Sequence, residues 1–336
     1  MSKKILIINT GGTLSSVMKE NGMAPGLSTD DMLSELRMVS GDADLSFMDF
    51  LALDSANILP RDWVSLAKKI GEEQSNYDGI VVIHGTDTLA YTSSMLSFML
   101  SNIAIPVVIT GSQLSMKHPV ADAMENCRLA IYMACEGYPG VFVAFNRKVI
   151  LGSRASKVRT LSFDAFESIN YPNVAEVSSL GLKVNENVVP DRHGIFKVKS
   201  SISEEVGVIK MYPGIKSSVL SSISKAGYKG VYIEAFGLGG MPFRDDDFIG
   251  ALKGLMDDGV AVLVGTQCRY EGSDLNIYET GKRAKEIGVM QAFDMTTEAA
   301  VTKLMWALGQ TDDMDEIREY FKVSLCGEVD IEGHER

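Results

Sequence analysis

Two short stretches of the sequence place threonine and aspartate side chains directly after apolar runs. Residues 5–8 are apolar and lead into a Thr-Gly-Gly-Thr segment that ends at Thr13, and residues 80–83 lead into a second polar segment that carries Thr86 and Asp87. Short apolar runs bounded by turn residues are typical of buried strands. Because ligands of α/β proteins bind beyond the carboxyl ends of the strands, we expect Thr13, Thr86 and Asp87 to surround one small substrate.

The chemistry that this set favours is nucleophilic catalysis by a threonine hydroxyl. Thr13 follows two glycines, so backbone can approach a substrate closely and amides can face developing negative charge. A hydroxyl nucleophile needs a base, and a lysine can serve if burial lowers its pKa. Lys157, in a turn after a predicted pair of strands, is the best-placed lysine. These residues alone do not choose between Thr13 and Thr86 for the first attack.

Other interpretations of the same segments explain less. Thr and Asp at strand ends commonly cap helices or stabilise turns, which is the more frequent role of either cluster alone. The two clusters together, with a lysine turn downstream, favour a site. The glycine clusters at residues 11–12 and 237–240 lack the other residues of phosphate-binding motifs. The histidines show no metal-ligand spacing, and there is no Gly-x-Ser-x-Gly motif.

Composition indicates a soluble globular enzyme of two domains. The chain has 336 residues, of which 46% are hydrophobic and 23% charged, and its net charge of −12 disfavours nucleic acid and anionic membranes as partners. We expect no transmembrane segment and no signal peptide, because the apolar runs are too short. The four cysteines have no CxxC spacing. Together these features predict a cytoplasmic protein with reduced thiols.

The elements that must position the site alternate between strand and helix. This pattern predicts an α/β fold, with a larger N-terminal domain at 1–190 built on a mostly parallel sheet with flanking helices. Periodicity is lost from about residue 175, and we place a linker at 191–205. The alternation restarts at 206–336, which predicts a smaller C-terminal α/β domain. Residues 15–28 are rich in Gly, Ser and Pro, which predicts a mobile loop that could act as a lid.

Two motifs carry a resemblance to a known family. The segments TGGTL at 10–14 and HGTDT at 84–88 resemble the two signatures of the bacterial-type L-asparaginases. The segments at 90–100, 110–113, 212–215 and 266–268 resemble the cytoplasmic, type I branch, so the likeness covers nearly the whole chain. It implies an asparaginase/glutaminase-like fold and hydrolysis of asparagine to aspartate and ammonia without metal or cofactor. It also implies a close homodimer, often paired into a homotetramer, with active sites near the contact between subunits.

The resemblance also implies roles for single residues. Thr13 would attack the side-chain amide carbon, and Thr86, Asp87 and Lys157 would handle protons. The segment at 54–55 would bind the α-carboxylate of the substrate, Asp87 would pair with its α-amino group, and main-chain amides near Thr86 would hold the oxyanion. The residues expected to contact substrate are Gly12, Asp54, Ser55, Gly85, Thr86, Asp87 and Ser112.

The sequence departs from the family pattern at two places. Many relatives carry a tyrosine in the lid loop that helps to activate the first threonine, and residues 21–25 contain none. Tyr278 matches a tyrosine that some type I relatives use instead, although packing of an interface tyrosine on a neighbouring subunit explains it equally well. Some type I relatives bind an activating asparagine through an arginine at the position of Glu234. A carboxylate there would repel the effector, so we expect weak or absent activation.

Three alternatives to a dedicated asparaginase remain open at this point. Broader specificity for asparagine and glutamine is one, because a single methylene is worth only ~1–3 kcal/mol of discrimination. An ammonia-supplying amidotransferase subunit is another, but relatives of that kind carry an extra N-terminal domain, and the first site strand at residue 5 leaves no room for one. An amino-acid sensor on the same scaffold would lack the nucleophile or the lysine, and Thr13 and Lys157 are both present.

Overall fold

The computed structural model describes residues 2–19, 22–25, 29–191, 194–244, 246–331 and 333. The chain divides into two compact units, Met1–Ser200 and Ser201–Arg336. Within the described residues, no helix has the length and apolar character that crossing a membrane requires. The finer boundaries proposed from sequence, with a linker at 191–205, stay a prediction.

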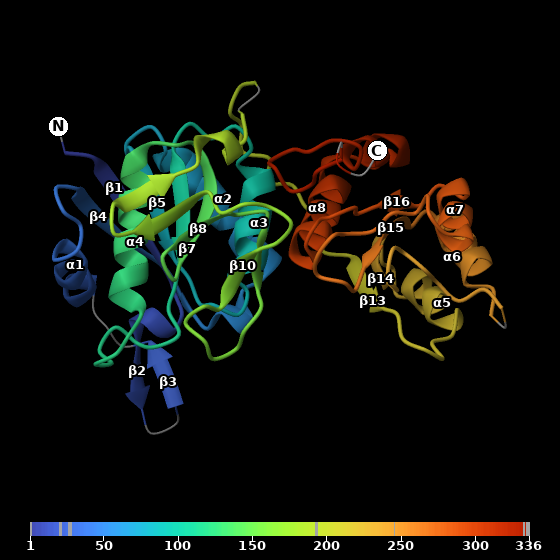
Figure 1. Ribbon diagram of the computed structural model, residues 1–336, viewed down its shortest axis with the longest axis horizontal. Coiled ribbons are helices and arrows are strands. Elements are labelled where there is room, and N and C mark those ends of the chain that lie inside the picture. Colours follow the sequence, from blue (N-terminus) through green and yellow to red (C-terminus); the bar gives the residue numbers. More distant parts are fainter. Residues whose placement is uncertain are drawn as a thin grey trace. The chain divides into compact units, whose positions relative to one another are not determined.

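The first unit is built on an eight-stranded sheet with the order β12-β11-β8-β7-β6-β5-β1-β4 (Figure 1). Its members are β1 (Lys4–Gly11), β4 (Asp44–Leu53), β5 (Gly79–Ile83), β6 (Pro106–Thr110), β7 (Gly140–Phe145), β8 (Lys148–Leu151), β11 (Ala175–Ser178) and β12 (Gly181–Val184). Pairing is parallel from β4 through β1, β5 and β6 to β7, and antiparallel beyond β7. Every residue of β5 and β6 is buried, as expected of parallel strands covered on both faces.

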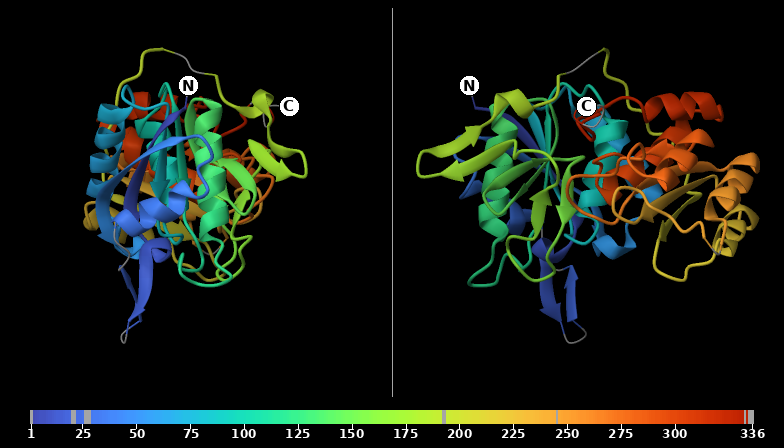
Figure 2. Two further views of the ribbon diagram at one scale, coloured as in Figure 1. Left: turned by 90° about the vertical axis from the view of Figure 1, so that its left-hand side faces the viewer. Right: turned by 45° about the vertical axis from the view of Figure 1, so that its right-hand side comes forward.

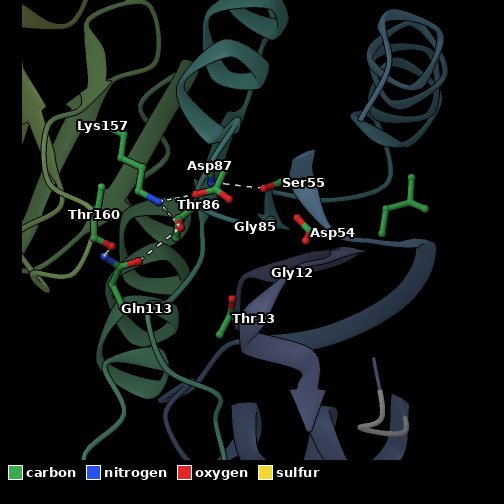
Figure 3. Close-up of a pocket in the computed structure, with 11 residues that line it drawn as sticks. Gly12, Thr13, Asp54, Ser55, Gly85, Thr86, Asp87, Gln113, Lys157 and Thr160 are labelled. Carbon is green, nitrogen blue, oxygen red and sulfur yellow. Dashed lines mark hydrogen bonds and ion pairs between the residues drawn. The ribbon is translucent and has the colours of Figure 1, made fainter. Parts of the chain in front are cut away.

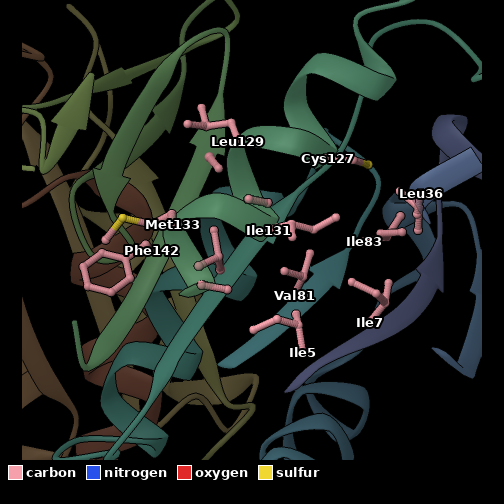
Figure 4. Packing of buried hydrophobic residues seen from close by; sticks show 14 of the residues in the cluster. Ile5, Ile7, Leu36, Val81, Ile83, Cys127, Leu129, Ile131, Met133 and Phe142 are labelled. Carbon is pink, nitrogen blue, oxygen red and sulfur yellow. The ribbon is translucent and has the colours of Figure 1, made fainter. Parts of the chain in front are cut away.

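Helices cover both faces of this sheet. They are α1 (Thr29–Arg37), α2 (Pro60–Glu73), α3 (Leu89–Met99) and α4 (Ala123–Glu136). Ile5, Ile7, Val81 and Ile83 belong to one apolar cluster with side chains of α1 and α4 (Figure 4). Alternate residues of a strand point to opposite faces, so the intervening residues of β1 and β5 face the other way. The left view of Figure 2 shows the sheet between α4 and the pair α2 and α3. The predicted α/β architecture is confirmed.

The parallel pairing brings four strand ends to one edge of the sheet. Strand β1 lies between β4 and β5, and β6 follows β5. Their carboxyl ends deliver residues 12–13, 54–55, 84–88 and 111–113 to the same edge. This is the geometry that the motif positions predicted from sequence.

Residues 16–19 and 22–25 differ from the sequence-based expectation. The structure has an antiparallel pair, β2 (Ser16–Lys19) and β3 (Gly22–Pro25), which projects from the first unit (Figures 1 and 2). The prediction of an irregular loop is therefore wrong for these residues, and the remainder of the proposed lid, residues 20–21 and 26–28, lies outside the described residues.

Residues 175–184 are the second difference. They form β11 and β12 at the edge of the large sheet, where the sequence predicted loss of regular structure. Most of these residues are exposed or half-buried. An edge pair of this kind buries too little apolar surface to leave a clear hydrophobic period.

The second unit is a parallel four-stranded sheet with helices. Its strands, in the order of the sheet, are β13 (Val206–Lys210), β14 (Gly230–Ala235), β15 (Ala261–Thr266) and β16 (Met290–Gln291). Its helices are α5 (Ser218–Lys225), α6 (Phe248–Asp257), α7 (Glu279–Glu286), α8 (Thr297–Gln310) and α9 (Met314–Tyr320). Apolar side chains of α5 and α6 pack on the sheet. The prediction of a smaller C-terminal α/β domain is confirmed.

Candidate active site

A cavity of about 240 Å³ opens at the edge of the first sheet where the four strand ends meet (Figure 3). It is lined by Gly12, Thr13, Leu53, Asp54, Ser55, Gly85, Thr86, Asp87, Gln113, Lys157 and Thr160. Eight of these eleven residues are site residues predicted from the sequence. Most of the lining side chains are polar or charged, which suits a small charged or amide-bearing molecule.

The chain segments that follow β1 and β5 approach each other closely at this cavity. Gly12 has φ +87°, and a Cβ atom there would lie 2.5 Å from Gly85 Cα. A Cβ atom on Gly85 would in turn lie 2.7 Å from Ser55 Oγ. These positions therefore require glycine, because a side chain would drive the ends of β1, β4 and β5 apart.

Lys157 and Thr86 form one wall of the cavity. Lys157 ends the short strand β9 (Ala155–Lys157), which pairs with β10 (Phe166–Ser168). Its Nζ atom donates to Thr86 Oγ1 at 2.8 Å and to Asp87 Oδ1 at 2.6 Å. The Lys157 side chain is only 16% exposed, whereas that of Asp87 is 64% exposed. The sequence-predicted trio is thus in direct contact, and Thr13 stands across the cavity from it (Figure 3).

Asp54 and Ser55 form the wall contributed by β4. Asp54 caps the short 3₁₀ helix η2 (Ser55–Asn57) by accepting from the amide of Ala56 at 3.0 Å. Ser55 Oγ accepts from the Asp87 amide at 3.2 Å, and the Ser55 carbonyl accepts from Thr88 Oγ1 at 2.8 Å. These bonds tie the end of β4 to the turn that carries Thr86. They leave the hydroxyl proton of Ser55 available for a ligand acceptor.

Both halves of the chain match one protein family. Residues 4–190 match "Asparaginase, N-terminal", and residues 205–321 match "Glutaminase/Asparaginase C-terminal domain". The chain belongs to the asparaginase family. The resemblance inferred from its two threonine motifs is confirmed.

Relatives of this asparaginase-family chain match it over nearly its full length. The L-asparaginase of Thermococcus kodakarensis is 42% identical over a match that covers 97% of this chain and 99% of that protein. A solved structure of the thermostable L-asparaginase from that organism superposes with a TM-score of 0.91 over 97% of this chain and 99% of that one. L-asparaginase 1 of Escherichia coli is 32% identical, covering 97% of this chain and 98% of that protein.

A relative of a different kind is also similar. A glutamyl-tRNA(Gln) amidotransferase component of Pyrococcus abyssi is 34% identical over 97% of this chain, but the match covers 76% of that protein. The full-length likeness is therefore to the L-asparaginases, including the type I protein of E. coli.

Gln113 is a residue of this asparaginase-family site that was not predicted from the sequence. Gln113 Oε1 accepts from Thr86 Oγ1 at 3.4 Å, and Gln113 Nε2 donates to the carbonyl oxygens of Thr160 and Ser162, each at 3.0 Å. Ser112, which was predicted instead, donates to the Leu114 carbonyl at 2.6 Å and is not among the residues that line the cavity. A substrate contact of Ser112 stays a prediction. Its position in the turn that follows β6 is the signal that could have pointed to it.

Two residues at the start of α4 hold the turn that carries Gln113. The Asp122 carboxylate accepts from the amide of Gln113 at 3.0 and 3.1 Å and from the amide of Leu114 at 3.1 Å. Asn126 Nδ2 donates to Asp122 and to the Gly111 carbonyl, each at 3.0 Å. Asp122 therefore holds the turn that places Gln113 beside Thr86, and it does not itself line the cavity.

Asp122→Ala is expected to lower both stability and turnover. It leaves the two turn amides without their acceptor, which costs about 1–3 kcal/mol for each group that stays buried and unsatisfied, and it frees Gln113 to move. Urea unfolding and kcat measure the two effects. Asp122→Asn keeps one acceptor oxygen and serves as the matched control, with a smaller loss of both. An unchanged kcat in Asp122→Ala would contradict the supporting role.

Two further points of the sequence analysis can be compared with the structure: the place of Tyr278 and the expectation that there is no metal site. Tyr278 belongs to the second unit, where it precedes α7 and is 61% exposed, and its role in activating a threonine stays a prediction. Among the described residues, no group of three or more His, Cys, Asp or Glu side chains is arranged to hold a metal ion.

Proposed function

We propose that this protein hydrolyses the side-chain amide of L-asparagine to L-aspartate and ammonia. The observation that carries the proposal is the Lys157 ammonium bound to Thr86 Oγ1 and to the Asp87 carboxylate in a cavity that Thr13 faces. The full-length similarity to proteins named L-asparaginase supports the same substrate.

In the proposed mechanism Thr13 is the nucleophile. Thr13 Oγ1 attacks the amide carbon and forms a C–O bond, and the negative charge on the amide oxygen is held by main-chain N–H groups near Thr86. Lys157 delivers a proton through Thr86 Oγ1 to the amide nitrogen, the C–N bond breaks and ammonia leaves. The proton that Thr13 Oγ1 gives up during its attack returns to Lys157 through solvent water, so Lys157 is an ammonium again at the end of the step. Water then cleaves the acyl-threonine ester and releases aspartate. The Thr86 hydroxyl already accepts from an ammonium, which suits proton transfer better than attack.

The other walls suit the zwitterionic end of the substrate. The second oxygen of the Asp87 carboxylate can accept from the α-ammonium group, and the Ser55 hydroxyl can donate to the α-carboxylate. Asp54 adds a second carboxylate to the lining. The selection of an α-amino acid over a simple amide follows from these groups.

Discrimination between asparagine and glutamine depends on a single methylene, and broader specificity is the alternative. Such a difference in a pocket is worth only ~1–3 kcal/mol, or about 10- to 200-fold in rate. We infer that asparagine is preferred and that glutamine is hydrolysed slowly.

Ammonia release tests the proposed function. The purified protein should release ammonia from L-asparagine and much more slowly from L-glutamine, and it should need no added metal or cofactor. Turnover of glutamine at an equal rate would support the broader amidohydrolase. The 34% identical amidotransferase component makes ammonia supply to a second enzyme the other candidate. Absence of ammonia from both amides would contradict all of these activities.

The assembly and setting of the enzyme are also proposals. We infer a homodimer or homotetramer with active sites near the contact between subunits, in the cytoplasm, acting in asparagine catabolism. The similarity to L-asparaginase 1 supports the type I assignment. Analytical ultracentrifugation of the active protein tests the assembly, and a purely monomeric active enzyme would contradict it.

Saturation by asparagine is expected to be hyperbolic. Glu234, at the end of β14, accepts from Thr297 Oγ1 at 2.6 Å and lies 3.5 Å from Lys210 Nζ, and its side chain is 12% exposed. A carboxylate held in this way repels the carboxylate of an effector amino acid. Initial rates over a wide range of asparagine concentration test the prediction. A sigmoidal curve would count against it.

A further inference from the structure

His84 is a buried histidine that the proposed mechanism does not use. It directly follows β5, is 1% exposed, and precedes Gly85 and Thr86 in the cavity wall. Burial lowers the pKa of His84 to about 4. The ring is therefore neutral at pH 7, and one of its nitrogens carries a proton while the other is an acceptor.

The neighbours of the ring decide which nitrogen carries the proton. His84 Nδ1 lies 2.7 Å from the Gly85 carbonyl oxygen, which can only accept. His84 Nε2 lies 2.9 Å from Thr92 Oγ1, and Trp63 Nε1 donates to the same oxygen at 2.9 Å. An indole N–H can only donate, so the Thr92 hydroxyl proton is free to point to Nε2. The contacts of both ring nitrogens therefore indicate the same tautomer, in which Nδ1 is protonated and donates to the Gly85 carbonyl.

This bond fixes the direction of the next amide. The peptide bonds of the described chain are trans, and the C=O and N–H of a trans peptide unit point in opposite directions. Holding the Gly85 carbonyl against the buried ring therefore turns the Thr86 N–H away from His84, toward the cavity side. Among the described residues this N–H has no hydrogen-bond acceptor. A donor of this kind is what an oxyanion requires.

The geometry points to His84 as a positioning residue that aims the Thr86 amide at the developing oxyanion. Thr92 and Trp63 hold the ring in the required tautomer and orientation, from α3 and α2 respectively. The inference rests on the proposed amide hydrolysis and deepens it. His84 itself neither contacts the substrate nor exchanges a proton with it.

Two substitutions separate this role from simple structural support. Asparagine places an amide nitrogen near the position of Nδ1, whereas glutamine places one near Nε2. His84→Asn can keep the bond to Gly85, and His84→Gln keeps only the link to Thr92. We expect His84→Gln to lower kcat for asparagine roughly 10- to 100-fold with KM little changed, and His84→Asn to recover most of that loss. A purely structural role predicts the reverse order, because His84→Gln preserves the chain to Trp63.

A second measurement does not depend on the variants folding. Nitrogen NMR of the wild-type protein labelled on histidine should show one ring with Nδ1 protonated and Nε2 unprotonated at neutral pH, assigned to His84 by its hydrogen bond to the Thr92 hydroxyl. A proton on Nε2, or His84→Gln at least as active as His84→Asn in an active wild-type background, would overturn this inference alone. A wild-type protein that releases no ammonia would overturn both this inference and the proposed function.

Discussion

Removal of either threonine hydroxyl is expected to abolish most of the asparagine hydrolysis. Thr13→Ala removes the proposed nucleophile, and Thr86→Val removes the hydroxyl that Lys157 contacts at 2.8 Å, at nearly constant volume. Groups that act as one unit in catalysis give losses that do not add. Each single variant should lose roughly 10³-fold or more in kcat, and the double variant should lose little beyond that.

The matched control for this experiment is a threonine outside the site. Thr311→Val, just after α8 in the second unit, makes the same chemical change as Thr86→Val and should leave kcat close to the wild-type value. Thermal unfolding of all variants separates loss of fold from loss of chemistry. Losses that multiply in the double variant would contradict a joint role for the two threonines.

Lys157→Met is expected to have the second large effect. Methionine fills a similar volume but carries no proton, so the Thr86 hydroxyl loses its proton source and the Asp87 carboxylate loses its ion pair. We expect kcat to fall roughly 10²- to 10⁴-fold, the range typical of general acid–base groups. KM should rise less, because Asp87 and Ser55 still line the cavity.

Lys157→Arg tests whether proton transfer or charge is what matters. Arginine keeps the positive charge beside Asp87, but its guanidinium does not give up a proton in proteins. We therefore expect Lys157→Arg to stay far below the wild-type kcat in a steady-state ammonia assay. Activity restored to the wild-type value by arginine would show that the charge alone suffices, and it would contradict proton delivery by Lys157.

The part of the site that sequence could predict is the part built from strand ends. Thr13 and Thr86 each follow an apolar run and a glycine, and parallel pairing of β1 with β5 brings such ends together by a simple rule. The close approach of the two strand ends also explains why glycine occupies position 12, since the Cβ atom of any other residue there would overlap Gly85. Local pattern and local backbone geometry were sufficient for these residues.

The part that sequence could not predict depends on contacts between distant segments. Gln113 matters because the loop between β9 and β10 brings the carbonyls of Thr160 and Ser162 to 3.0 Å from its amide nitrogen, and no periodicity encodes that approach. Helix α7 gives only a weak signal in the sequence, because it buries just Thr280, Gly281 and Ala284 and so has a narrow apolar stripe. The role of Tyr278, which precedes this helix, accordingly still rests on resemblance.

The measurement that tests the central claim most directly is identification of the acylated residue. Asparagine should be mixed with the enzyme, quenched in acid within the first turnover and digested, and the peptides should be analysed by mass spectrometry. We expect an added aspartyl group, lost on treatment with base, on the peptide that carries Thr13 and not on the one that carries Thr86. The same ester on Thr86 would contradict the assignment of the nucleophile and would reverse the proposed roles of the two threonines.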